Sequence, residues 1–116
     1  MIFDVEIVLR ERNFATTERI EHGIEPRAWS ERDVEIVLKQ ILRAIDRARN
    51  PEAPASHVTL RGFSWIVEPL DEGVVIAIEI PMGAAVAGPF AIEQARLDGL
   101  VRRVVAAAAV ARPTVH

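Results

Sequence analysis

HVTLRGFSWIVEPLDEGVVIAIEI, residues 57–80, decides the fold, because its pattern predicts two strands folded back on each other. In residues 63–68 the side chains alternate: Phe63, Trp65 and Val67 are all apolar, whereas the positions between them are mostly polar. This two-residue period is typical of a half-buried strand. Residues 74–80 are apolar except for one glutamate and are rich in β-branched side chains. Between the two runs lie a proline, two acids and a glycine, which are typical of tight turns. The stretch therefore predicts an antiparallel hairpin.

The turn also predicts which side chains of the hairpin lie opposite each other. If Val67 pairs with Val74, then Trp65 lies opposite Ile76, and Phe63 takes the next such position. These apolar pairs share one face, which we expect to be buried. The other face is then expected to carry Ser64, Glu68, Val75, Ala77 and Glu79.

Within the first strand of the hairpin, the apolar side chains move from the even-numbered to the odd-numbered positions. Val58 and Leu60 share one phase, whereas Trp65 and Val67 share the other. A β-bulge at Gly62 would produce this change, because one extra residue moves all later side chains to the opposite face. The alternative is a strand that is covered on both faces.

Two segments before the hairpin have clear patterns. Residues 2–10 alternate between apolar and mostly polar side chains, which predicts a strand with one wet face. Ser30 begins the best helix signal: its side chain can cap the amide of Asp33, the carboxylate of Asp33 can reach back, and Trp29 can pack onto Val34. The apolar spacing that follows predicts a long amphipathic helix.

The segments at either side of these elements are less regular. In residues 13–30 we expect a long loop with a short turn of helix capped by Thr16 or Thr17 and closed by Gly23. Residues 83–88 read as a connection of small residues, and Pro89 suits the first position of a second long helix.

These elements predict an α+β fold in one domain, residues 1–116. We expect a two-layer sandwich: a three-stranded, mainly antiparallel sheet with two long helices on one face, in the order β-α-β-β-α, like a split βαβ unit. The strand at residues 2–10 would then lie parallel to residues 74–80 as an unpaired edge. That edge and the broad apolar arc of the last helix predict a homodimer.

The composition excludes several classes of protein. The 116 residues contain no cysteine, so disulfides, thiolate metal sites and a cysteine nucleophile are absent. A formal net charge of −3 lacks the positive field that binding to nucleic acid or to an anionic membrane needs. No secretory leader or membrane span is readable, so we expect a cytoplasmic protein.

The candidate ligand-binding residues are His22, Arg27 and Trp29 in the long loop, with Arg61 on the hairpin. An imidazole, a guanidinium and an indole together suit the binding of a small acid, or acid/base chemistry near neutral pH. The same residues also have an ordinary interpretation, in which Trp29 packs at the start of a helix while His22 and Arg27 are solvated. For His57, which lies where a strand is expected to begin, the ordinary structural interpretation is favoured over a role in binding.

Other patterns point to chemistry more weakly. The 83–88 loop resembles a phosphate cradle but lacks the lysine and hydroxyl residue of a P-loop. The basic stripe Lys39, Arg43, Arg47 is typical of a solvated helix face. We predict no catalytic residue, no metal site and no cofactor.

The sequence therefore favours a small binding or accessory module that acts as a homodimer and carries no catalytic group. The alternative is a small-molecule-binding protein or enzyme, with a pocket between sheet and helices near residues 22–29. Its partner would be either a small molecule or another protein.

Overall fold

The computed structural model describes residues 1–52 and 58–110 of the chain. Five strands, two α-helices and a short 3₁₀ helix, η1, follow one another along this part. Their bounds are β1 Ile2–Leu9, β2 Ala15–Glu21, η1 Pro26–Ala28, α1 Glu31–Arg49, β3 Ser64–Leu70, β4 Gly73–Ile80, β5 Gly83–Phe90 and α2 Gln94–Val110. The α+β class is as predicted, but the number of strands is not.

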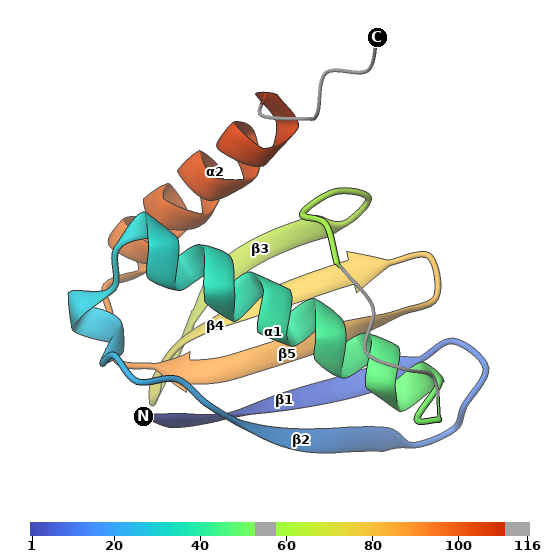
Figure 1. Cartoon of the computed structure of the whole chain (residues 1–116). Coiled ribbons are helices and arrows are strands. Elements are labelled where there is room, and N and C mark those ends of the chain that lie inside the picture. The colour runs from blue at the N-terminus through green and yellow to red at the C-terminus, as the bar shows by residue number, and fades with distance from the viewer. Residues whose placement is uncertain (53–57, 111–116) are drawn as a thin grey trace, which may run out of the picture.

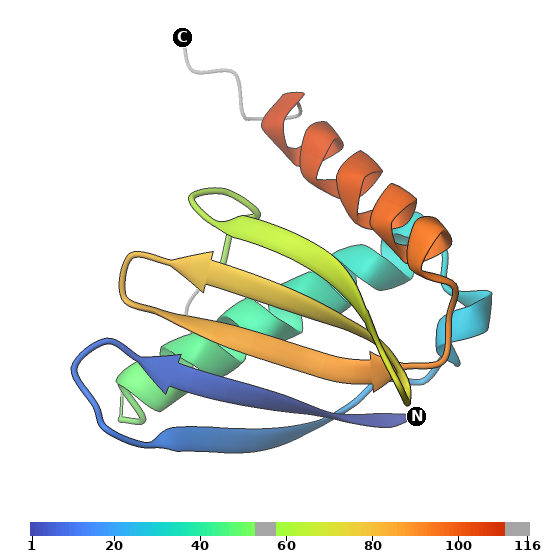
Figure 2. The ribbon, with the colours of Figure 1, turned by 180° about the vertical axis from the view of Figure 1, so that it is seen from behind.

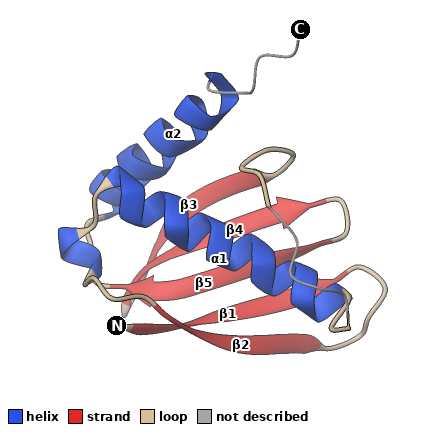
Figure 3. Cartoon of the chain, viewed as in Figure 1, coloured by secondary structure: helices blue, strands red, loops and turns tan. Residues whose placement is uncertain are grey.

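The five strands form one sheet in the order β2-β1-β5-β4-β3, and every neighbouring pair is antiparallel. Figures 1 and 3 show α1 lying across one face of this sheet, while α2 packs against α1 and β3. Seen from behind in Figure 2, the strands have no helix in front of them. The sheet therefore has one covered face and one open face.

The prediction of a three-stranded, split-βαβ sheet is wrong, and so is the prediction that the first strand is an edge. β1 lies inside the sheet, between β2 and β5, and runs antiparallel to both. The two missed strands account for the error. They also remove the exposed β1 edge, which was one of the two reasons to expect a homodimer.

β2 replaces the predicted loop and short helix in residues 13–30. On its inner parity lie Thr16, Glu18 and Ile20, of which only Ile20 is buried. Because the other two inward positions are polar, the strand lacks the apolar alternation that marks β1. Its polar inner side is explained by α1, since a guanidinium nitrogen of Arg47 bonds the carboxylate of Glu18.

β5 replaces the predicted connection at residues 83–88, and Pro89 lies in this strand rather than in a helix. The Gly88–Pro89 peptide bond is cis. Small side chains at Ala85 and Ala87 leave room on the covered face for α1, and both are buried. The last helix starts at Gln94, several residues later than predicted.

The hairpin of β3 and β4 has the predicted faces in a shifted register. Val67 lies opposite Ile76, and Trp65 lies opposite Ile78, which is two residues further along β4 than predicted. The shift arises because β3 continues to Leu70, leaving a turn of only two residues. A shift of two preserves the parity of every side chain, so the same residues share a face. Val75, expected on the wet face, is nevertheless buried, beside the irregularity in the β4–β5 pairing at Val74 and Ile76.

The predicted strand at Val58 and Leu60 and the β-bulge at Gly62 are wrong. β3 begins only at Ser64, and Gly62 lies before it with a φ of 74°. Leu60 is nevertheless buried, because the segment before β3 folds onto the core rather than pairing as a strand. The change in the positions of the apolar residues therefore marks the point where an irregular segment ends and β3 begins.

The predicted start of α1 is confirmed. The backbone amide of Ser30 donates to Oδ2 of Asp33 over 2.9 Å, and the amide of Asp33 donates to Oγ of Ser30 over 3.4 Å. One helical stripe of α1 is buried against the sheet: Val34, Val37, Leu38, Ile41, Ala44 and Ile45. This stripe and the inward residues of the strands make one hydrophobic core.

Candidate functional site

The open face of the sheet carries apolar side chains at its centre. Val86 on the middle strand β5 is 41% exposed, Val8 on β1 is 48% exposed and Ile66 on β3 is 49% exposed. Strand pairing aligns Val86 with Ala77 of β4, and Ala77 with Ile66. We call the following outward residues of the central and β3 strands the open face: Glu6, Val8, Ser64, Ile66, Ala77, Glu79, Ala84 and Val86.

Two hollows lie on this open face. One of about 620 Å³ is lined by Val8 and Arg10 at one side and by Phe63 at the other, and it includes the turn between β4 and β5. A second of about 300 Å³ runs over Ile66 and Val86. Both hollows are lined by Ser64, Glu79 and Ala84. The face is therefore indented, with Glu79 at the junction.

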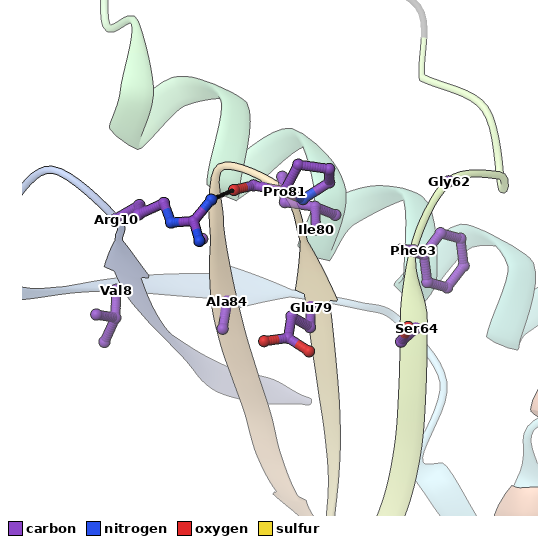
Figure 4. A pocket seen from close by; sticks show the side chains of 10 residues that line it. Val8, Arg10, Gly62, Phe63, Ser64, Glu79, Ile80, Pro81 and Ala84 are labelled. Atoms are coloured by element: carbon purple, nitrogen blue, oxygen red, sulfur yellow. Dashed lines mark hydrogen bonds between the residues drawn. The ribbon is translucent and has the colours of Figure 1, made fainter.

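Figure 4 shows the larger hollow, with the carboxyl group of Glu79 between Ala84 and Ser64. The pairing of the strands places them so, since Glu79 lies opposite Ser64 on one side and Ala84 on the other. Arg10 reaches across the rim, and its Nη1 lies 3.5 Å from the carbonyl oxygen of Pro81, a long contact. The hollow thus has a carboxylate on its floor and a guanidinium at its edge.

Three exposed carboxylates on the outward side of the sheet form no ion pair with any residue that the structure describes: Glu6 on β1, Glu68 on β3 and Glu79 on β4. Glu6 and Glu79 flank the middle strand β5, whereas Glu68 lies on the edge strand β3. Nearby, Asp4 is paired with Arg19 of β2, with 3.3 Å between Nε and Oδ1. The centre of the open face therefore combines apolar side chains with two unpaired negative charges.

Both edges of the sheet are obstructed. At β2, the side-chain amide of Gln40 donates to the outward carbonyl oxygen of Glu21 over 3.2 Å. At β3, the side-chain amide of Gln94 donates to the outward carbonyl oxygen of Val67 over 3.0 Å. Pro69 shares the outward parity of Val67 and has no N–H to offer. Neither edge presents an intact row of backbone groups for another strand.

Two of the four sequence-predicted site residues, His22 and Trp29, are brought together. Their rings meet edge to face with centroids 5.9 Å apart. Trp29 is fully buried, its Nε1 donates to the carbonyl oxygen of Ile24 over 2.9 Å, and its ring packs on Phe90. Neither His22 nor Trp29 lines any of the three hollows described for residues 1–52 and 58–110.

His22 is held by the capping box of α1. Its Nε2 lies 3.1 Å from Oδ1 of Asp33, while Oδ2 of Asp33 accepts from the amide and the hydroxyl of Ser30. The hydrogen bond from the Ser30 amide is the main cause that lowers the pKa of Asp33 below 3.8, and the hydroxyl and His22 add to it against the opposing effect of burial. The serine hydroxyl bonds the carboxylate rather than the imidazole, so these three side chains are not arranged as a nucleophilic triad.

Arg27 and Arg61 lie apart from this pair. Arg27 is exposed on η1. Arg61 donates weakly to the carbonyl oxygen of Ala108 over 3.4 Å and lines a third hollow of about 360 Å³ with Asp46 and Arg49. His57 lies outside the described residues. The four predicted residues therefore do not share one hollow in the described structure.

Sequence reasoning missed most of the open face as a surface. It placed Ala77 and Glu79 on the outer side of the hairpin. However, it predicted a polar outer side for β1 although Val8 is apolar, and it did not identify β5, which carries Val86. A usable signal was present in Val8 and Ile66, which are large apolar residues at outward positions. Two such residues on separate strands indicate a partly apolar outer face.

Neither a metal site nor a membrane-spanning helix is found in the part of the chain that the structure describes. Within that part no group of three or more His, Asp or Glu side chains is arranged to hold a metal ion. Neither α1 nor α2 combines the length and apolar character that crossing a membrane requires. Comparisons with protein families, curated proteins and solved structures find no match to this chain.

Proposed function

We propose that the protein is a single-domain, non-catalytic binding module of the cytoplasm that acts as a homodimer and binds its partner through the open face. The observation that carries this proposal is the exposure of Val86 and its neighbours at the centre of the sheet. An apolar outer face at the middle of a sheet, hollowed and without a covering helix, is a surface that gains free energy from a partner.

A homodimer is supported by the last turns of α2. Residues 104–110 contain only valine and alanine, and Val110 is 83% exposed. Ala106, Ala107 and Ala109 are also exposed, so the helix surface there has no charged or polar side chain. Small side chains allow two helices to approach closely, and a two-fold axis would bury both copies of this segment at once.

Sedimentation equilibrium at micromolar concentration tests the dimer. We expect the wild-type chain to sediment as a dimer and Ala107→Glu to sediment as a monomer, because a carboxylate would be buried in the interface. Ala95→Glu, at an exposed position in the first turn of α2, is the matched control and should leave the dimer intact. A wild-type chain that is monomeric throughout this range would remove the homodimer from the proposal.

A selection from a displayed peptide library of mixed charge tests the open face. We expect binders, and we expect Val86→Arg to abolish most of them, because it replaces an apolar contact by a charge at the centre of the face. Ile36→Arg is the matched control, since Ile36 is 37% exposed on α1 and lies on the other side of the molecule. Binders that are indifferent to Val86→Arg would rule out the open face as the binding surface.

A second candidate function is the binding of a small molecule at the third hollow. Arg61, Arg49 and Asp46 line its 360 Å³, which lies within the size range of ligand sites. A ligand at 100 times its dissociation constant would add about 2.7 kcal/mol to the free energy of unfolding. A thermal-shift screen against metabolites with the wild type and Arg61→Ala therefore separates this candidate from the first.

A further inference from the structure

We propose that the open face binds a cationic amphipathic helix of a partner protein, lying along β5 with basic side chains over Glu6 and Glu79. This inference rests on the proposed function, because it names the chemistry of the partner that the open face would take. It goes beyond that proposal by assigning Glu6 and Glu79 as the residues that select for a positively charged partner.

The positions of the two carboxylates set the size of the partner. Glu6 aligns with Val86 across the β1–β5 pair, and Val86 aligns with Ala77, which is two residues before Glu79. Two strand spacings separate β1 from β4 by about 10 Å, and the two residues add about 7 Å along the strand. The Cα atoms of Glu6 and Glu79 are therefore about 12 Å apart, on opposite sides of β5.

A helix matches this spacing. An α-helix with its side chains is about 10–12 Å wide, so one that lies over β5 has its two flanks above β1 and β4. An eight-residue strand such as β5 is about 27 Å long, which is the length of a helix of about 18 residues. The outward side chains of β5 are small at Ala84 and Val86, so the apolar ridge of a helix can approach this strand closely.

The apolar contacts come from residues on both sides of β5. Val8 of β1 and Ile66 of β3 are half exposed, and they border the two hollows that meet at Ala84 and Glu79. Apolar side chains of a partner helix would fill these hollows. Exposed apolar surface would then be buried on both molecules.

The charges decide which partner is selected. Glu6 and Glu79 have no cationic partner among the described residues, so lysine or arginine side chains at the helix flanks would complete two ion pairs. A second copy of the chain would bring the same carboxylates against its own acidic face, which disfavours a symmetric contact there. An anionic polymer such as nucleic acid is disfavoured for the same reason.

The edges of the sheet leave the open face as the better surface for a peptide. An extended peptide would need a free strand edge, but Gln40 and Gln94 occupy outward carbonyl groups and Pro69 lacks an N–H. A helix satisfies its own backbone groups and needs only side-chain contacts. The obstructed edges and the indented face therefore favour the same kind of partner.

Three designed peptides of about 18 residues test the proposal by fluorescence anisotropy. All three have the same leucine ridge, and their flanking residues are lysine and arginine, glutamine, or glutamate. We expect the cationic peptide to bind the wild-type chain about 10-fold tighter than the glutamine peptide, because two exposed ion pairs form, and the glutamate peptide to bind weakest. The difference should shrink as salt is raised from about 0.05 M to about 0.5 M.

The double variant Glu6→Gln/Glu79→Gln should lose this 10-fold preference, while the control Glu35→Gln on α1 should keep it. Equal binding of the three peptides, or a preference that survives in the double variant, would overturn the inference while the open face remains a binding surface. Binding of none of them would also overturn it. The proposed function is tested by other experiments, the library selection with Val86→Arg and the sedimentation of the wild-type chain, so the two failures are distinguishable.

Discussion

Nε2 of His22 lies 3.1 Å from Oδ1 of Asp33, and this contact joins the residue after β2 to the first turn of α1. The same carboxylate accepts from the amide and hydroxyl of Ser30. The carboxylate of Asp33 therefore completes the capping box of α1 and also holds His22, in the segment that leads into the helix. The stability of this corner depends on Asp33 being ionised.

Asp33→Asn should lower the free energy of unfolding by about 1 kcal/mol at pH 7, because the capping carboxylate loses its charge. The pKa of Asp33 is lower in the folded chain than its ordinary 3.8, so ionised Asp33 contributes stability above pH 3.8 that is lost as pH falls through the folded pKa. The difference between wild type and variant should therefore shrink as pH falls below 3.8 and disappear only below the folded pKa of Asp33. Urea unfolding at a series of pH values measures it.

The control for this experiment is Asp71→Asn, the same change in the exposed turn between β3 and β4. Its effect should stay small at every pH. If Asp33→Asn is as mild as Asp71→Asn at pH 7, the capping box does not stabilise the fold as described.

Trp29→Ala should cost about 3–5 kcal/mol, since Trp29 is fully buried and packs between His22 and Phe90. Trp29→Phe should cost less but still more than Trp65→Phe, because it leaves the carbonyl oxygen of Ile24 without its donor. Trp65 is only partly buried, with the guanidinium of Arg102 5.7 Å from its ring centroid. Chemical denaturation of the three variants gives the order, and a smaller loss for Trp29→Phe would contradict it.

Ile76→Ala should cost about 2–5 kcal/mol, whereas Glu79→Ala should be mild. Both residues lie on β4, but Ile76 faces the core with no exposed surface and Glu79 faces the open side. The pair therefore tests the facing of the sheet with one strand as its own control. Similar losses of unfolding free energy in denaturation would mean that the two sides of β4 are assigned incorrectly.

Gly83→Ala should destabilise the chain by about 1–3 kcal/mol, because a methyl group at Gly83 would collide with the carbonyl oxygen of Val8 where β5 meets β1. Gly23→Ala is the matched control: a methyl group there meets no atom within 4 Å. Its effect should lie within about 0.5 kcal/mol of zero. A thermal or urea melt of each variant is sufficient, and equal stability of the two would place β5 differently from the structure.

Local sequence patterns predicted the elements that bury a continuous apolar stripe. α1 has a capping signal and helical spacing, and the hairpin of β3 and β4 alternates strongly, so their faces could be read directly. β2 and β5 could not be read in this way. Glu18 of β2 is satisfied by Arg47, and Ala85 of β5 is small because α1 lies against it, and both reasons come from tertiary contacts.

The candidate binding face was hidden for a related reason. Its central residue, Val86, can be recognised as part of a binding surface only when β5 is placed between β1 and β4. The order of elements along the chain does not reveal that placement. The buried pair of His22 and Trp29 could be anticipated as a cluster, since both lie in one short segment. Their burial could not, because it depends on Phe90 arriving from the far end of β5.

The plugged borders of the sheet, at Gln40, Gln94 and Pro69, have a consequence for the chain at high concentration. Fibrils grow when identical molecules add strand to strand without limit, and these side chains interrupt the template that such growth would copy. Exposed valine and isoleucine can therefore remain on the outer side of the sheet without seeding that kind of growth.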